Sequence, residues 1–362
     1  MTPGVLWKDN WGEAKKNLIK WWNREGMALS IVAERSLPRL IMSKPSKPIN
    51  LEQCWIDPIY RCNASEYYMV THEYLAEAFP YFDTQIGPGS LGVILGVKPI
   101  YDVETVWYES CIDDPERFTG ISLATEGNSQ LLAHIALIDE GLKRSNKRYL
   151  VGIPDLIENI DTLAAMRGNS QLLYDLLERP GWVHERLAEI NQAYFAVFNM
   201  LFEKVQDEDG GNAFAAFNIW GPGKTAKLQC DFSAMISPHM FQEFVVPYLS
   251  AQCKWLDYSL YHLDGTTALH HLDILLEVEN LNAIEWTPQA GRPGGGSQEW
   301  YNLYKRIKRG GKGIQAIGVK AYELIPLIDA IGPEGLFILL DEPAMGLSEA
   351  EELVKKVEPY YP

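Results

Sequence analysis

Short apolar runs rich in β-branched and aromatic residues alternate with longer segments of helical periodicity along most of the chain. This alternation is typical of βα units built around parallel strands. It predicts strands over 29–33, 90–95, 148–154, 213–220, 258–265, 282–288, 313–319 and 336–343. It also predicts helices over 181–206, 238–255, 298–309 and 348–357, the last with Ser348 as its N-cap.

Several of the later strands end in polar or special residues, in "NIWG", "HLDG", "WTPQAG" and "LLDEP". In a (β/α)8 barrel the carboxyl ends of the strands form the active-site face. A doubly wound open sheet usually carries a glycine-rich phosphate loop after its first strand, and the sequence has none with that spacing. We therefore expect an α/β protein, a single (β/α)8 TIM barrel over residues 66–362. Residues 1–65 are expected to form an N-terminal helical extension that packs on it.

The net charge and the cysteine content limit which partners the protein can bind and in which cellular compartment it can function. The net charge of −16 disfavours nucleic acid or an anionic membrane surface as a partner. The amphipathic, tryptophan-rich start of the chain lacks the run of about 18 apolar residues that would cross a bilayer. The five cysteines are scattered, odd in number and without a CxxC pair, which favours reduced thiols in a cytoplasmic protein.

The stretch "LYHLDGTTALHHLDILL" at 260–276 carries the densest candidate chemistry. His262 and Asp264 are two apart on a predicted strand, so their side chains project to the same side. His270 and His271 fall in a helical pattern, where neighbours point about 100° apart and do not easily share one ion. For His262 and Asp264 three interpretations stay open: a metal site, a metal-free acid–base or substrate-binding role, and a structural role in the loop.

Other residues at strand ends, together with aromatic residues, are candidates for binding a substrate. Aromatic rings in a pocket suit an aryl ether or a quaternary ammonium, although tryptophan and tyrosine also simply fill a large barrel. Asp155 either faces the pocket or caps the helix that follows it. Cys230 and Asp231 begin the block before the "ISP" motif. The candidate substrate-binding residues are Trp107, Asp155, Asn218, Trp220, Tyr261, Trp286 and Gln289.

Two long stretches resemble a known family. These are "GIPDLIENIDTLAAMRGNSQLLYDLLERPGWVHERL" at 152–187 and "DFSAMISPHMFQEFVVPYLSAQCKWLD" at 231–257, followed by a strand that ends in "YHLDG". They are similar to blocks of the uroporphyrinogen decarboxylase superfamily, and the resemblance covers roughly residues 65–362. It implies a single (β/α)8 barrel. Members of this superfamily include the porphyrinogen decarboxylase and cobamide-dependent methyltransferases.

The resemblance favours the methyltransferase branch. The decarboxylase holds its many-carboxylate substrate with an arginine-rich N-terminal motif, whereas this chain offers only Arg35 and Arg39 in "AERSLPR". In the thiol-methylating enzymes of the family, a His-x-Cys pair and a cysteine after the last strand hold zinc. The matching positions here are His262, Asp264 and Asp341, so that carboxylates replace both thiolates. The resemblance thus implies catalytic and metal-binding roles for these three, with zinc or another divalent metal bound.

These observations predict a methyltransferase that moves a methyl group from a small methylated donor to the cobalt of a separate corrinoid protein. The loss of both thiolates favours an ether or an amine donor over a thiol. Two alternatives remain. One is a lyase or decarboxylase of a small carboxylated substrate, with His262 and Asp341 as acid and base. The other is a non-catalytic barrel that binds a tetrapyrrole or corrinoid.

Overall fold

The computed structural model describes residues 7–361 and is organised around a seven-stranded sheet. The strand order is β2-β1-β13-β12-β11-β10-β9, and every neighbouring pair is parallel except β2 with β1. The bounds are β1 Ala28–Glu34, β2 His72–Ala76, β9 Thr225–Gln229, β10 Tyr258–Asp264, β11 Ala283–Thr287, β12 Gly313–Val319 and β13 Leu336–Leu340.

The remaining strands are short and form separate pairs. They are β3 Tyr81–Phe82 with β6 Leu150–Val151, β4 Lys98–Tyr101 with β5 Val106–Glu109, and β7 Asn212–Phe214 with β8 Ile219–Gly221. A parallel bridge between Ile153 and Phe214 continues from β6 toward β7. The architecture is mixed α/β and compatible with a TIM-like fold. However, the hydrogen-bonded ladders of residues 7–361 do not join into the closed eight-stranded barrel that the sequence predicts.

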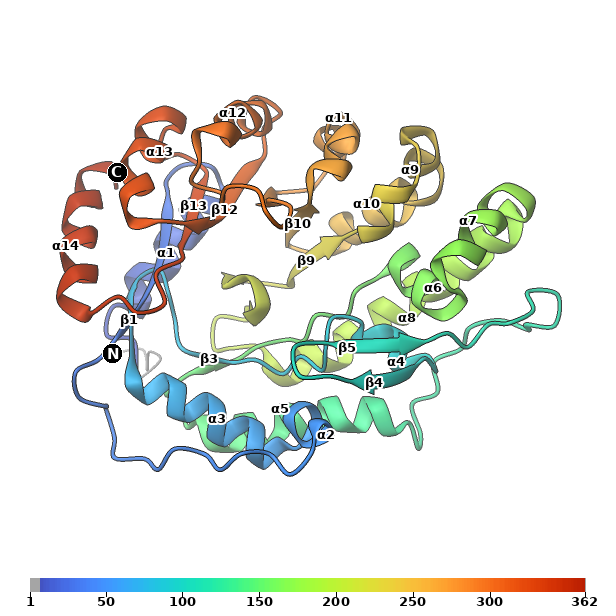
Figure 1. Ribbon diagram of the computed structural model, residues 1–362, viewed down its shortest axis with the longest axis horizontal. Coiled ribbons are helices and arrows are strands. Elements are labelled where there is room, and N and C mark those ends of the chain that lie inside the picture. The colour runs from blue at the N-terminus through green and yellow to red at the C-terminus, as the bar shows by residue number, and fades with distance from the viewer. Residues whose placement is uncertain (1–6, 362) are drawn as a thin grey trace.

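Helices surround the strands, and α9 to α14 follow the outer side of the parallel strands in Figure 1. No helix in the described part of the chain is long and apolar enough to cross a membrane. The α-helices are α1 Trp11–Trp22, α2 Leu51–Ile56, α3 Pro58–Thr71, α4 Ser90–Ile94, α5 Ser129–Ser145, α6 Asn159–Arg167, α7 Asn169–Glu178, α8 Pro180–Val205, α9 Pro238–Phe244, α10 Val246–Trp255, α11 Leu272–Glu277, α12 Tyr301–Arg309, α13 Leu324–Ile331 and α14 Leu347–Val357.

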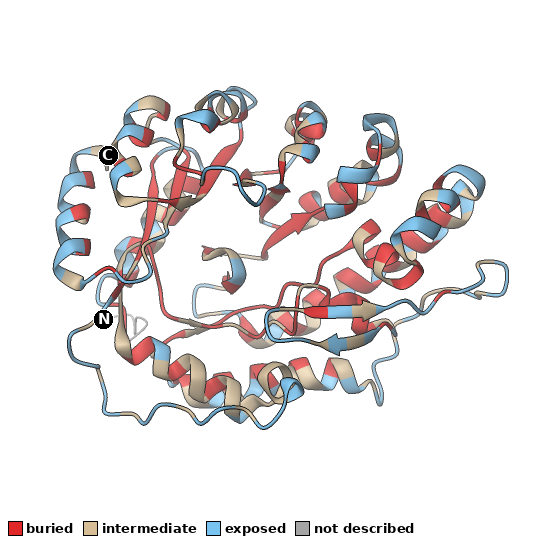
Figure 2. Cartoon of the chain, in the orientation of Figure 1, coloured by how far each residue is buried: buried red, intermediate tan, exposed pale blue. Residues whose placement is uncertain are grey.

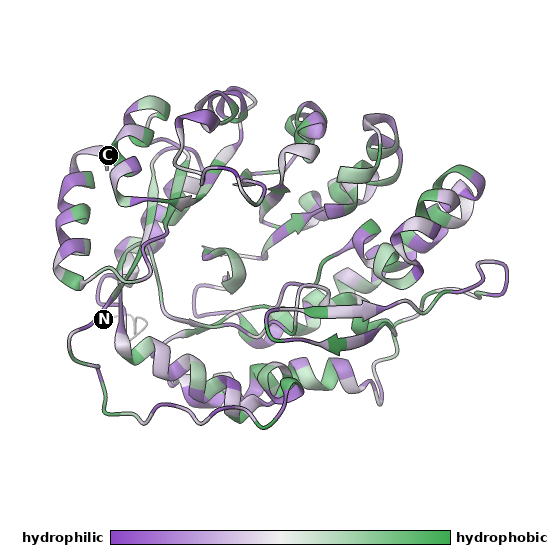
Figure 3. Cartoon of the chain, in the orientation of Figure 1, coloured by the Kyte–Doolittle hydropathy of each residue, from purple (hydrophilic) through white to green (hydrophobic). Residues whose placement is uncertain are grey.

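Burial explains this arrangement. The central strands are buried along most of their length (Figure 2), whereas the outer helices mix hydrophilic and hydrophobic positions (Figure 3). Such helices bury one apolar stripe against the sheet and leave the other face to water. The tryptophan-rich helix α1 packs on the body of the protein as the sequence predicts. The indole N–H groups of Trp21 and Trp22 donate to the carbonyls of Ile314 and Trp220, at 3.1 and 2.9 Å. The first strand, β1, lies within residues 1–65 and is a member of the central sheet.

Four local predictions were wrong for identifiable reasons. Residues 213–220, predicted as one strand, form the antiparallel pair β7 and β8, because the chain reverses at a 3-10 turn and at Asn218 in a left-handed backbone conformation. Residues 90–95, predicted as a strand, form the helix α4, and all five of its residues are buried, so the segment has no polar face to reveal a period. The predicted helix 238–255 is two helices that meet at Val245, because Pro247 lacks an N–H and its ring crowds the preceding turn. Helix α14 begins after Gly346, so Ser348 lies inside it and is not its N-cap.

A buried carboxylate ties the two ends of the chain to the sheet. One oxygen of Glu77 accepts hydrogen bonds from the backbone N–H of Leu29 on β1 and from the hydroxyl of Tyr361, at 2.8 and 2.6 Å. The other oxygen accepts from the side-chain amide of Asn17 on α1, at 2.9 Å. Because a buried carboxylate needs its partners, each of these bonds stabilises the fold.

Replacement of Tyr361 with phenylalanine is expected to lower the free energy of unfolding by about 1–2 kcal/mol, since it removes one bond from a buried carboxylate. Urea unfolding measures this loss. The matched control is Tyr360→Phe, which removes an exposed bond to Asp329 and is expected to have a much smaller effect. Equal losses in the two variants would contradict the role assigned to Glu77.

Candidate functional site

The inner face of strand β10 carries the candidate chemistry. The structure places His262 and Asp264 on the same face of the strand, because successive side chains alternate. The register pairs His262 with Gln229 on β9 and with Glu285 on β11. Three polar side chains therefore form a row across neighbouring strands, near their carboxyl ends.

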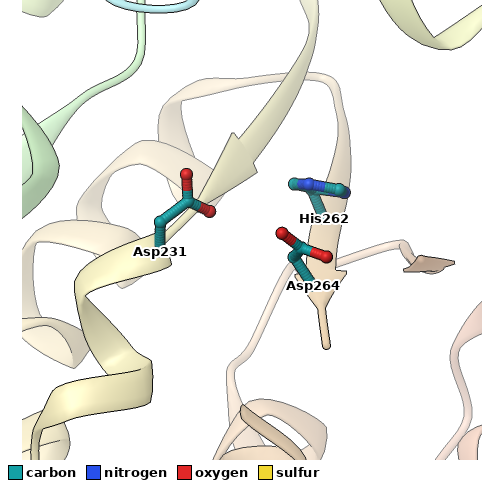
Figure 4. A group of neighbouring side chains, drawn as sticks. All are labelled: Asp231, His262 and Asp264. Carbon is teal, nitrogen blue, oxygen red and sulfur yellow. The ribbon is translucent and has the colours of Figure 1, made fainter. Parts of the chain in front are cut away.

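Asp231 completes a compact group with these two residues. It follows Cys230 after the end of β9 and starts the short 3-10 helix η2, Asp231–Met235. One ligand atom each from Asp231, His262 and Asp264 lies within 4.8 Å of the others, and Figure 4 shows the three side chains converging. Both carboxylates are exposed, whereas the His262 side chain is only 15% exposed. The group thus opens to solvent through its carboxylates.

Glu285 fixes the orientation of His262. The fully buried Glu285 carboxylate is ion-paired with Nδ1 of His262, and its other oxygen accepts from the Thr287 hydroxyl at 2.8 Å. Burial alone would lower the pKa of His262, but the charge and the hydrogen bond of Glu285 outweigh it and raise that pKa. Because Glu285 occupies Nδ1, Nε2 is the ring atom that is left for a ligand or a substrate.

Asp161 from helix α6 holds the segment that carries Asp231. Its two oxygens accept from the backbone N–H groups of Asp231 and Phe232, at 2.7 and 2.8 Å. Burial, and then the nearby charge of Asp231, raises the pKa of Asp161 to about 6. Asp161 therefore positions the start of η2 and at the same time adds a carboxylate beside the group.

A buried polar layer lies beneath the group. Lys227 on β9 has no exposed side-chain surface and pairs with Asp155 at 2.7 Å; its ammonium also donates to the side chain of Gln229. Glu158 accepts from the backbone N–H of Gln229 at 2.7 Å through one oxygen, and its other oxygen is buried without a partner. Burial raises the pKa of Glu158 to about 8, against the opposing charge of Lys227, so it is mostly protonated at neutral pH.

Two cavities are lined by members of the group, and a third adjoins one of them. One of about 360 Å³ is lined by His262, Phe217, Asn218, Thr287 and Asp341, among others. A second, of about 550 Å³, contains Asp161, Asp231, Trp107 and Tyr108 in its lining. A third, of about 430 Å³, adjoins the first through shared residues that include Asn218 and Asp341. These volumes suit small molecules rather than polymers.

Asp341 lies near His262 without joining the three-residue group. It follows β13 and lines the same cavity as His262, but its carboxylate is paired with Lys320 at 2.8 Å. The backbone carbonyl of Asp341 accepts from the same ammonium at 2.7 Å. The third position of the His262–Asp264 group is therefore filled by Asp231.

The predicted substrate-binding residues separate into two sets. Asn218, in a left-handed backbone conformation, lines two of the cavities, and Trp107, which is 60% exposed, lines the cavity that contains Asp231. Asp155 is buried against Lys227 and binds the backbone N–H of Ile157, so it neither reaches a cavity nor caps a helix. The residues that line none of the three cavities are Asp155, Trp220, Tyr261, Trp286 and Gln289.

The alternation of side chains along a strand explains why Tyr261 and Trp286 line none of the three cavities. The locations of Trp220 and Gln289 in the fold explain why these two do not. Tyr261 and Trp286 alternate with His262 and Glu285, so they face the helix layer, where Trp286 packs on Trp300 at 5.0 Å between ring centres. Trp220 donates to Asp207 at 2.7 Å and packs on Trp11 of α1. Gln289 is exposed in the loop after β11 and accepts from the hydroxyl of Thr266.

His270 and His271 have structural contacts. His271 is buried, stacks on Phe241 and contacts the carbonyl of Ser233 at 2.9 Å through Nε2. His270 contacts the carbonyl of Ile236 at 3.3 Å. Neither belongs to the three-residue group, which agrees with the helical pattern of that segment.

Four polar residues of the site, Glu285, Lys227, Glu158 and Asp161, were not predicted from the sequence. A signal for the first two was present, because each is a charged residue in the middle of an otherwise apolar strand, "NAIEWTP" and "TAKLQC". Charged side chains are rarely buried unless they are paired or functional. Glu158 and Asp161 follow a short strand in the chain, and only the fold brings them against β9.

Comparisons with known proteins bear on the fold. No protein-family model and no curated protein matches the chain. Among solved structures, a methyltransferase from Methanosarcina mazei is similar, with a TM-score of 0.60 and 10% sequence identity. The alignment covers 96% of this chain and 99% of that one. The two proteins therefore share a fold over nearly their whole lengths.

The buried Glu158 predicts a pH dependence of stability. Its pKa is raised in the folded state, so the native protein binds a proton that the unfolded chain releases between about pH 4.5 and pH 8. This contribution to stability is present below that window and decreases as pH rises through it. Glu158→Gln keeps an oxygen acceptor for Gln229 and cannot ionise, so it removes the dependence.

We therefore expect the unfolding free energy of wild type, relative to Glu158→Gln, to fall by up to about 1.4 kcal/mol per pH unit across this window. Urea titrations at several pH values, with a chelator present throughout, measure the difference. Parallel pH curves for the two proteins would refute the assignment of a protonated Glu158.

Proposed function

We propose that this chain is a methyltransferase that moves a methyl group from a small methylated ether or amine to the cobalt of a separate corrinoid protein. The observation that carries the proposal is the convergence of Asp231, His262 and Asp264 at the carboxyl ends of β9 and β10, beside cavities of small-molecule size. In barrel-like folds this edge of the strands is where catalytic groups gather. The fold shared with a methyltransferase and the sequence resemblance support the same activity.

The three-residue group has the composition of a divalent-metal site. It offers one imidazole nitrogen and two carboxylates within 4.8 Å, and Glu285 holds the ring in the manner of a carboxylate behind a metal-binding histidine. A set of nitrogen and oxygen ligands without sulfur suits zinc with a water ligand, manganese or iron. When bound, such an ion would act as a Lewis acid toward the leaving atom of the donor.

The other requirements of methyl transfer are met by side chains of this protein. Cobalt(I) is itself a strong nucleophile, so the enzyme has to orient the donor and stabilise its leaving group. His262, held by Glu285, faces the 360 Å³ cavity in which we place the donor. Asp161 fixes the backbone at Asp231 and keeps that carboxylate beside His262. The corrinoid protein would approach over the strand ends, where Asp231 and Asp264 are exposed.

The lining of the cavities disfavours the alternative of a decarboxylase. No lysine or arginine is among the residues that line the two cavities next to His262 and Asp341, although Asp83, Asp341 and Glu342 are. A carboxylated substrate would meet these carboxylates, because two cationic side chains close to them, His262 and Lys320, are already paired with Glu285 and Asp341. A neutral or cationic methyl donor meets no such penalty.

Metal analysis of the purified protein tests the proposed ligands. Wild type is expected to retain close to one equivalent of a divalent ion, and Asp264→Ala and Asp231→Ala to lose most of it. Asp341→Ala is the matched control, because Asp341 is engaged by Lys320. Unchanged metal content in the first two variants would remove the metal site, and loss in the control would restore Asp341 as a ligand.

The absorbance of cobalt in a reduced corrinoid protein tests the transfer itself. Mixed with candidate methylated ethers and amines, the chain is expected to convert the cobalt(I) spectrum to that of a methylated corrinoid. His262→Ala is expected to slow the reaction by about 100-fold or more, since it removes the central polar group. His270→Ala, an exposed histidine near the site, is expected to keep the wild-type rate. Failure with every ether and amine, alongside release of carbon dioxide from an acid, would overturn the proposal.

A further inference from the structure

The 430 Å³ cavity, which adjoins the cavity lined by His262, has an unusual lining, and we call it the tyrosine pocket. Three tyrosines line it, Tyr68 from α3, Tyr74 from β2 and Tyr81 from β3. Three carboxylates line it as well, those of Asp83, Asp341 and Glu342. The lining contains no lysine and no arginine. Aromatic faces combined with negative charge are the composition that recognises a small organic cation.

The tyrosines gather their phenol groups close together. Tyr74 is only 6% exposed, and its pKa is raised by burial and then by the neighbouring phenols of Tyr68 and Tyr81. Burial and the charge of Asp83 also raise the pKa of Tyr81. All three rings are therefore neutral at physiological pH. The rings are electron-rich and add no negative charge of their own. The ring of Tyr68 stacks on His72, which also lines the pocket, with 3.8 Å between the ring centres.

The carboxylates are only partly neutralised by the protein. Asp341 is paired with Lys320, and Glu342 uses one oxygen to accept from the backbone N–H of Ala321 at 3.0 Å. Burial raises the pKa of Asp83 in spite of the nearby positive charge of Arg61. The N–H groups of Arg61 donate to backbone carbonyls, including that of Asp83 itself, and not to the carboxylate. A cation in the pocket would offset the cost of burying Asp83.

We propose that the tyrosine pocket binds the positively charged nitrogen of a small methylated ammonium compound. The proposal rests on the proposed function and makes an amine, rather than an ether, the class of donor. The tyrosine pocket joins the His262 cavity through Val32, Asn218, Leu340 and Asp341, which line both. A donor held by its ammonium group can therefore extend from the tyrosine pocket toward His262.

Calorimetric titration with choline and with its neutral isostere 3,3-dimethylbutan-1-ol tests the proposal directly. The two molecules have nearly the same shape and differ in charge. Wild-type protein is expected to bind choline roughly 2- to 30-fold more tightly, the range that corresponds to one or a few cation–π contacts. Equal affinity for the two molecules, or no binding of choline at millimolar concentration, would overturn the proposal.

Two variants locate the binding on this pocket. Tyr68→Leu removes a half-exposed ring, and Glu342→Gln removes a charge while keeping an oxygen for Ala321. Each is expected to weaken choline binding by roughly 2- to 30-fold and to leave binding of the neutral isostere unchanged. The matched controls are Tyr322→Leu and Glu352→Gln, exposed residues outside the lining, which are expected to bind choline like wild type. Wild-type affinity in both pocket variants, with circular dichroism showing that they are folded, would contradict the location.

Because the titration needs neither a corrinoid nor turnover, it separates this proposal from the proposed function. Selective choline binding without methyl transfer from any donor would keep the tyrosine pocket and remove the methyltransferase activity. Methyl transfer from an ether, with no preference for choline over the isostere, would keep the activity and remove the tyrosine pocket.

Discussion

The need to pair buried charges governs the interior of this protein. Lys227 on β9 and Glu285 on β11 are both fully buried on the same face of the sheet, and an isolated charge there would cost several kcal/mol. Asp155 satisfies the first and His262 the second. The same pairing that stabilises the buried charges holds His262 in one orientation and leaves Nε2 free of Glu285. The geometry of the site is thus a by-product of neutralising the core.

This constraint also separates the polar layer from the exposed cluster. Asp155, Glu158 and Lys227 lie below, closed off from solvent, while Asp231 and Asp264 lie above, at the open ends of the strands. A donor molecule would meet only the upper part and the neighbouring cavities. Glu158, in the lower part, fixes the backbone of β9 by accepting from the N–H of Gln229. This bond helps to set the position of Asp231, whose backbone N–H is held by Asp161.

Sequence patterns predicted β1 and the strands β10 to β13 well, and most of the strands between β1 and β10 poorly. Strands such as 258–264 and 313–319 were found because they are apolar runs bounded by turn residues, whereas 90–94 is buried on every side and its helical period leaves no trace. His262 and Asp264 were found from their spacing of two. The same rule, applied to Tyr261 and Trp286, would have placed both rings on the opposite face. Glu285 stands out as a charged residue in an apolar strand, but its pairing with His262 and the approach of Asp231 depend on contacts between separate strands, which no local pattern reports.

The pairing of β1 with β13 has a consequence for biosynthesis. Ala28 lies opposite Phe337, so the first strand of the central sheet receives a parallel neighbour only after more than three hundred further residues have been made. Until then β1 has one partner, the antiparallel β2. Contacts of such long sequence separation slow folding and leave strand edges open to other chains. On the ribosome, β1 therefore lacks its parallel neighbour for most of the synthesis of the chain, and its edge stays open to other chains until β13 has been made.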